Sequence, residues 1–171
     1  SQDLKAFGKI ARSISEEKSI PYIQLMHAGG QANEVKTGFK PVSPSGIPCK
    51  SINSSPNILL EKDIEKIIKS FCDSAIIAEE IGFKGVELHL SHGYLLHEFI
   101  SPRTNLRQDY YGGNNIQKRF TIIKEIINLI NKKTKLDIGL RVSGDDFVKN
   151  GLSRNDIKEM SKEEQTKKLK I

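Results

Sequence analysis

Residues 62–90 read KDIEKIIKSFCDSAIIAEEIGFKGVELHL, and this stretch decides the fold class. Its first twenty residues place apolar side chains at helical spacing on one stripe. Gly82 is suited to end this helix, and residues 84–90 follow directly as an apolar strand. A helix that leads into a buried strand is the repeating unit of parallel α/β sheets. The members of the stripe are Ile64, Ile67, Ile68, Phe71, Ala75, Ala78 and Ile81.

The same unit occurs on both sides of this stretch. Residues 3–16 have helical periodicity and precede a short apolar run at 20–27. Residues 117–131 form another amphipathic helix before a strand at 137–143. Three helix–strand units in a row predict parallel strands joined by right-handed crossovers. The 171 residues suffice for one domain, but a complete (β/α)8 barrel usually needs about 250.

Two segments lack this periodicity. Residues 31–60 are rich in Pro, Ser, Gly and Asn, which predicts either a binding loop or a linker between domains. Residues 154–171 are charged and poor in large apolar groups, which predicts either a frayed helix or a disordered tail. We therefore expect a barrel-type domain over residues 1–153 and a charged tail over residues 154–171. The N-S-S sequon at Asn53 carries little weight for a protein expected in a reducing cytoplasm.

Composition argues against several classes of protein. The net charge of +6 comes mainly from lysines scattered among acids, and the densest run, 167–170, has no aromatic neighbours. Solvated surface lysine is therefore favoured over a nucleic-acid interface. No apolar run approaches ~18 residues, so no membrane span is expected, and the first residues lack a secretory signal pattern. Cys49 and Cys72 are too few for a disulfide scaffold or zinc site, which favours the cytoplasm.

Polar residues cluster where the three predicted strands end. Gln24 and His27 end the first, His89 ends the second with His92 and Tyr94 just beyond, and Arg141 and Ser143 end the third. The carboxyl ends of parallel strands meet at one edge, where α/β proteins bind ligands. Unpaired polar groups are costly in a core. The pattern therefore predicts an active site at this edge.

The residues alone leave the chemistry of this edge open. His89 and His92 could be two metal ligands, hydrogen-bonded histidines of structural importance only, or a pair of donors that grip a carbonyl oxygen. In the third case Tyr94 would be a proton donor, because a phenol stays protonated at neutral pH. Residues 111–114, YGGN, could cradle a phosphate or simply lead into the next helix.

A longer pattern resembles a known family. Residues 89–99, HLSHGYLLHEF, continue with Ser-Pro at 101–102, NLRQD at 105–109 and YGG at 111–113. This string closely resembles the Old Yellow Enzyme family of FMN-dependent NADH:flavin oxidoreductases. Further matches, in family order between residues 20 and 153, are QLMHAG at 24–29, PVSPS at 41–45 and LRVS at 140–143.

The resemblance implies a fold, cofactors and roles. It implies part of a TIM (β/α)8 barrel, about strands three to five with their helices. Gln24 would bind the pyrimidine edge of FMN and Arg141 would lie near flavin N1. His89 and His92 would hold the substrate oxygen, and Tyr94 would protonate the α-carbon. The implied activity is ene-reduction of α,β-unsaturated carbonyl or nitro compounds, with NADH or NADPH as the reductant and a small enone or related molecule as substrate.

The sequence also departs from the family. Gly30 stands where the family usually has Arg, and Lys118 where it commonly has Asn. Strands one, two and six to eight, with the loops that bind the FMN phosphate, have no counterpart. The alternatives are therefore a catalytically incomplete, truncated fragment, or one part of a split barrel that needs a complementary chain or a homo-oligomer. A His-based metal hydrolase is a further alternative, but it requires a carboxylate or Lys ligand at another strand end, and none is evident. We expect no metal, nucleic acid or membrane partner.

Overall fold

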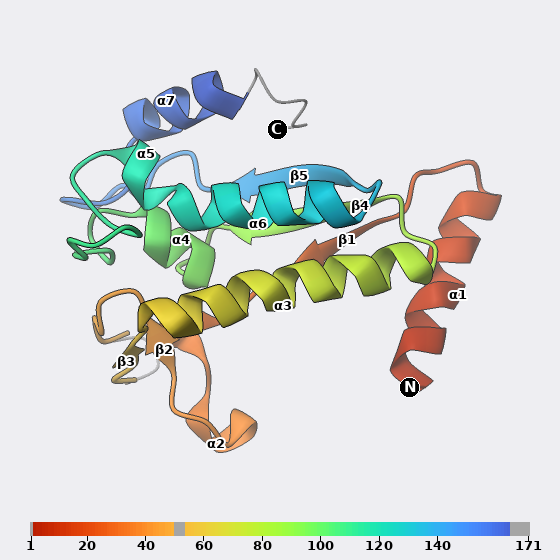
Figure 1. The fold of residues 1–171 in the computed structure, drawn as a ribbon, viewed down its shortest axis with the longest axis horizontal. Coiled ribbons are helices and arrows are strands. Elements are labelled where there is room, and N and C mark those ends of the chain that lie inside the picture. The colour runs from red at the N-terminus through yellow and green to blue at the C-terminus, as the bar shows by residue number, and fades with distance from the viewer. Residues whose placement is uncertain (1, 50–53, 165–171) are drawn as a thin grey trace.

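A three-stranded parallel sheet forms the centre of the computed structural model, which describes residues 2–49 and 54–164. Strands β1 (Tyr22–Leu25), β4 (Gly85–Leu90) and β5 (Asp137–Val142) lie in the order β1-β4-β5. Tyr22 pairs with Gly85, and Gly85 pairs with Asp137, so the three strands run in step (Figure 1). The predicted parallel α/β architecture is confirmed.

Amphipathic helices cover one face of this sheet. Helix α3 (Glu61–Glu80) and helix α6 (Thr121–Lys133) pack side by side over it (Figure 1). Helix α1 (Gln2–Glu16) lies crosswise near the amino ends of the strands. Gly82 follows α3 with a φ of 106°, as the sequence predicted for the residue that ends the helix. The core between helices and sheet consists mainly of Ile64, Ile68, Phe71, Val86, Leu88, Leu90, Ile123, Ile126 and Ile130.

The other face of the sheet is polar. Side chains alternate between the faces of a strand, so Val86, Leu88 and Leu90 under the helices leave Glu87 and His89 on the opposite face. Hydrogen bonds across this face join Gln24 to Glu87, and Tyr22 to Asp137. The sheet therefore separates an apolar core from a row of polar side chains that come from all three strands.

The described parts of residues 31–60, expected as a loop or a linker, form short elements near the carboxyl end of the sheet. They begin with the last residue of a 3-10 turn, η1 (Gly29–Gln31), and contain a short helix, α2 (Glu34–Thr37), and two strands that pair in parallel, β2 (Val42–Ser43) and β3 (Asn57–Ile58). Arg107 Nη1 donates hydrogen bonds to the carbonyl oxygens of Pro44 and Leu59, at 2.8 and 2.6 Å. These bonds tie the segment to the carboxyl end of the sheet, so it is no interdomain linker.

Three further helices complete the described chain. Helix α4 (Leu95–Ile100) follows β4 and was not expected from the sequence. The helix predicted over 117–131 is divided at Phe120 into α5 (Ile116–Arg119) and α6. Helix α7 (Arg154–Glu164) packs near α5, where Arg119 Nη2 and Asp156 Oδ1 lie 3.0 Å apart.

The presence of α7 decides between the two alternatives for the start of the charged tail. Residues 154–164 are helical, and Met160 is buried in the core. Residues 165–171, with the basic run, and Asn53 lie outside the described residues. The division of the chain at residue 153 into a domain and a tail stays a prediction.

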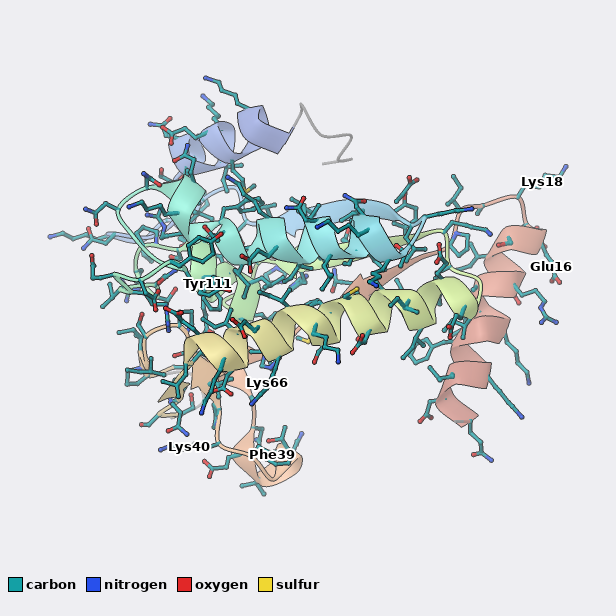
Figure 2. All side chains as sticks on the ribbon, in the orientation of Figure 1. Glu16, Lys18, Phe39, Lys40, Lys66 and Tyr111 are labelled. Carbon is teal, nitrogen blue, oxygen red and sulfur yellow. The ribbon has the colours of Figure 1, made fainter. Side chains whose placement is uncertain are left out.

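The surface carries long charged side chains. Lys18 and Lys40 are exposed and point away from the ribbon (Figure 2). None of the helices in the described part of the chain has the length and apolar character needed to span a membrane.

We expect Ile126→Ala to destabilise the fold by about 2–5 kcal/mol, because it removes a fully buried side chain between α6 and the sheet. Urea unfolding of the purified protein measures this. Asn128→Ala, on the exposed side of the same helix, is the control and should change stability by less than about 0.5 kcal/mol. Equal effects of the two substitutions would contradict the packing described for α6.

Candidate active site

Three of the predicted site residues lie together at the carboxyl end of β4. His89 is 4% exposed, and its Nε2 lies 3.1 Å from Nδ1 of His92. The ring centroids of His89 and His92 are 5.1 Å apart, and those of His89 and Tyr94 are 5.4 Å apart. Tyr94 is half-buried and stands at the amino end of α4. The structure therefore brings His89, His92 and Tyr94 into one cluster.

A tight turn makes this cluster. His92 and Gly93 have φ values of 60° and 73°, and the backbone N–H of Tyr94 donates to the carbonyl oxygen of Ser91 at 3.3 Å. Positive φ at both central positions is the requirement of a type I′ turn. Gly93 adopts this conformation without strain, whereas a histidine rarely does. The turn directly follows β4, and within it His92 and Tyr94 both lie beside His89.

The two residues that the resemblance assigns to the flavin lie on the strands that flank β4. Arg141 of β5 is in register with His89, and Gln24 of β1 is in register with Glu87. Gln24 Nε2 donates to Glu87 Oε1 at 2.6 Å. Both Gln24 and Arg141 are exposed, in contrast to His89. They occupy the polar face of the sheet next to the histidine cluster.

Electrostatics keep His89 neutral. Burial lowers its pKa most, and the neighbouring His92 and Arg141 lower it further. Its Nδ1 is buried with no hydrogen-bond partner among the described residues. An unpaired buried nitrogen costs about 1–3 kcal/mol unless a bound molecule or a water supplies the missing bond. His27, at the end of β1, instead pairs locally, because its Nδ1 accepts from the backbone N–H of Gly29 at 3.0 Å.

Helix α4 adds a buried acid that sequence reasoning missed. Glu98 is 6% exposed, and its two carboxylate oxygens accept from the backbone N–H of Gly30 at 3.2 and 3.1 Å. Burial raises the pKa of Glu98 to about 7, and the Gly30 bond offsets only part of that effect. A Cβ on Gly30 would lie 2.6 Å from Glu98 Oε1. Two titratable residues, His97 and Glu98, inside the otherwise apolar run 95–100 were the available signal.

Two other interpretations of the sequence, a metal site and a phosphate cradle, gain no support from this geometry. Within residues 2–49 and 54–164, no three His, Cys, Asp or Glu side chains are placed to hold a metal ion together. The YGGN segment leads into α5, which has only four residues, and Asn115 Oδ1 caps it by accepting from the backbone N–H of Lys118 at 2.9 Å. The geometry of that segment is the one expected of a helix entry.

Comparison with known proteins defines the family. All 171 residues match the sequence model of the NADH:flavin oxidoreductase / NADH oxidase family, and the chain belongs to that family. An NADH oxidase of Thermoanaerobacter brockii is 36% identical over 93% of this chain and 25% of its own length. An NADPH dehydrogenase of Bacillus cytotoxicus is 35% identical over 94% of this chain and 45% of its own length.

Solved structures give the same fold. A complex of 2-naphthoyl-CoA reductase with 2-naphthoyl-CoA has a TM-score of 0.89 at 25% identity, and the match covers 100% of this chain and 28% of that one. A histamine dehydrogenase from Rhizobium sp. 4-9 has a TM-score of 0.89 at 24% identity, over 95% of this chain and 24% of that one. Both neighbours have the TIM-barrel fold. The three strands are therefore part of such a barrel, as predicted.

Family membership confirms the resemblance and implies FMN and NADH or NADPH as redox partners. The chain spans a quarter to less than half of the length of the curated relatives named above. Neither the family nor the fold tests the individual roles of Gln24, His89, His92, Tyr94 and Arg141, which stay predictions.

We expect Glu98→Gln to flatten the pH dependence of stability. Because the folded-state pKa of Glu98 lies at about 7, above the ordinary 4.5, its contribution is complete below pH 4.5 and is lost as pH rises through 7. The free energy of unfolding of the wild type should therefore fall by up to about 3 kcal/mol over this pH range, relative to that of Glu98→Gln. Urea unfolding across the range measures the difference.

The exposed Glu61 supplies the control. Glu61→Gln, in the first turn of α3, should leave the slope of stability against pH as in the wild type. If stability depends on pH with the same slope in the wild type and in Glu98→Gln, the pKa of Glu98 is not raised by its burial.

Proposed function

We propose that the protein is an FMN-dependent NAD(P)H oxidoreductase that reduces the activated C=C bond of α,β-unsaturated carbonyl or nitro compounds. The observation that carries the proposal is the cluster of His89, His92 and Tyr94 at the carboxyl end of β4. Membership of the NADH:flavin oxidoreductase family supports it. The NADPH dehydrogenase relatives point to the same redox chemistry.

The residues beside the cluster fit an FMN ring. Arg141 and Gln24 are exposed on the polar face, on the two strands that flank β4. A guanidinium keeps its charge at all physiological pH values, and an amide both donates and accepts, so the pair suits the polar pyrimidine edge of a flavin. When bound, FMN supplies a hydride that it receives from NADH or NADPH.

Two histidines of the chain then bind the substrate oxygen. His89, held neutral by its surroundings, and His92 face each other through His89 Nε2 and His92 Nδ1. A substrate oxygen that takes the place of the bond between these two nitrogens would accept an N–H from each ring. Two donors aimed at a carbonyl or nitro oxygen draw electron density from the alkene and stabilise the negative charge that develops on that oxygen. The β-carbon thereby becomes a better hydride acceptor.

Tyr94 completes the reduction as the proton donor. Its ring lies beside that of His89, in the same cluster as the oxygen-binding pair. A neutral phenol that donates its proton to the α-carbon turns the charged product of hydride transfer into the saturated compound. Tyr94 then recovers its proton from solvent.

Activity on this scheme needs more of the barrel than three strands. The two outer strands, β1 and β5, pair with no further strand among the described residues. Open edges of a parallel sheet favour pairing with further strands. We infer that further barrel strands, a complementary chain or a homo-oligomer complete the site, and that the protein works in the cytoplasm, where NAD(P)H is supplied.

The experiment is reduction of cyclohexenone by NADPH, followed without oxygen, together with flavin absorbance of the purified protein. Tyr94→Phe should lower kcat by about 10²–10⁴-fold, the usual contribution of a general acid, while FMN content stays the same. Tyr110→Phe, an exposed tyrosine outside the cluster, is the matched control and should keep full activity.

Two results would count against the proposal. A colourless protein that takes up no added FMN would exclude flavin chemistry by this chain on its own. A yellow protein in which Tyr94→Phe reduces cyclohexenone as fast as the wild type would remove Tyr94 from its role.

A further inference from the structure

We propose that Gln31, His97 and Asp146 act as positioning residues that hold the peptide unit between His92 and Gly93 and thereby fix the His92 ring against His89. This inference rests on the proposed function, because it assigns the parts that orient one of the two oxygen-binding histidines. None of the three residues belongs to the cluster itself.

Both polar groups of that one peptide unit are bonded to side chains. Gln31 Nε2 donates to the carbonyl oxygen of His92 at 2.7 Å, and the backbone N–H of Gly93 donates to His97 Nδ1 at 2.8 Å. The C=O and N–H of a trans peptide point in opposite directions, so the two side chains grip it from two sides. Rotation of the peptide plane would break both bonds together.

The turn needs such support. His92 has a φ of 60°, which costs a non-glycine residue about 1 kcal/mol or more. The bond that closes the turn, from Tyr94 to Ser91, is long at 3.3 Å. Hydrogen bonds from residues outside the turn therefore do much to stabilise His92 in this conformation.

His97 is fixed in turn by Asp146. Because Nδ1 of His97 accepts a hydrogen bond, the ring proton lies on Nε2, which donates to Asp146 Oδ1 at 2.9 Å. Asp146 also accepts from Ser101 Oγ at 3.1 Å and from the backbone N–H of Leu152 at 2.7 Å. Burial raises the pKa of Asp146, but these bonds outweigh it and lower the pKa below the ordinary value, so the acid stays ionised and accepts. Both side chains of the pair are only 11% exposed.

The three residues come from three different parts of the edge. Gln31 ends η1, which follows β1; His97 lies on α4, which follows β4; and Asp146 lies in the segment that follows β5. The loops after all three strands therefore converge on one peptide unit. This convergence ties the orientation of His92 to the two strands that carry Gln24 and Arg141.

Two substitutions of His97 separate its two bonds. Asn places an acceptor near the position of Nδ1 and so keeps the bond to Gly93, whereas Gln places a donor near the position of Nε2 and keeps only the bond to Asp146. His97→Gln should lower kcat/KM for cyclohexenone by about 10²-fold, the usual result of displacing a group by about 1 Å. His97→Asn should lose clearly less, with FMN content unchanged in both.

A double-mutant cycle shows whether His97 acts through His92. In a His92→Ala background, His97→Gln should cost less than about 2-fold further, because the side chain that it positions is gone. An equal loss in both backgrounds, or an equal loss for His97→Asn and His97→Gln, would overturn the proposal. Gln31 holds the same peptide from the other side, and its side chain is half-exposed. Gln31→Ala therefore replaces His97→Gln in the cycle if His97→Gln does not fold.

An NMR measurement that does not depend on enzymatic activity tests the positioning role separately from the proposed function. The ring ¹⁵N resonances of His92 should shift in His97→Gln and in Gln31→Ala and stay near their wild-type positions in His97→Asn. If the wild type does not reduce cyclohexenone, the proposed function fails for this chain on its own, and these resonances alone decide the positioning role. Unshifted His92 resonances in both His97→Gln and Gln31→Ala would refute it.

Discussion

The in-step pairing of β4 with both of its neighbours is the constraint on which the rest of the molecule depends. Gly85 aligns with Tyr22 on one side and with Asp137 on the other. Because side chains alternate between faces, a slip of one residue would move His89 into the apolar layer and a leucine onto the polar face. The burial of Leu88 and Leu90 under the helices therefore also fixes the direction of His89. In β4 the same register therefore satisfies both the packing of the core and the geometry of the site.

The fold could be predicted where apolar residues repeat with a clear period. Helix α3, expected over 62–81, spans Glu61–Glu80, and the strands expected at 84–90 and 137–143 span Gly85–Leu90 and Asp137–Val142. Helix α4 could not be predicted in this way. All six of its residues are buried, so it has no exposed polar side to create a period, and tertiary contacts hold it in place. The short elements within residues 31–60 are likewise fixed by long-range bonds, such as those of Arg107.

The candidate site could be predicted only in part, for a similar reason. The carboxyl ends of parallel strands lie at one edge of a sheet, and this rule was enough to predict that His89, His92, Tyr94 and Arg141 lie at the same edge. It gave no information on the bonds that orient them. His97 and Asp146 are 49 positions apart in the sequence, and Glu98 and Gly30 are 68 apart. No local pattern joins residues at such separations, and only the folded chain shows that the loops after all three strands meet around α4.

Two acids beside α4 have pKa values that are shifted in opposite directions. Glu98 faces η1, where burial outweighs a single backbone donor and raises its pKa to about 7. Asp146 faces the other side, where bonds from His97, Ser101 and Leu152 keep it ionised. An Arg at position 30, which the family resemblance leads one to expect, would put a cation beside Glu98. With Gly30 there instead, the Glu98 contact needs only an acceptor oxygen, and that oxygen is present whether the acid is protonated or not. Around neutral pH the η1 side of α4 can therefore exchange a proton without losing its hydrogen bond, while the Asp146 side keeps the charge that orients His97.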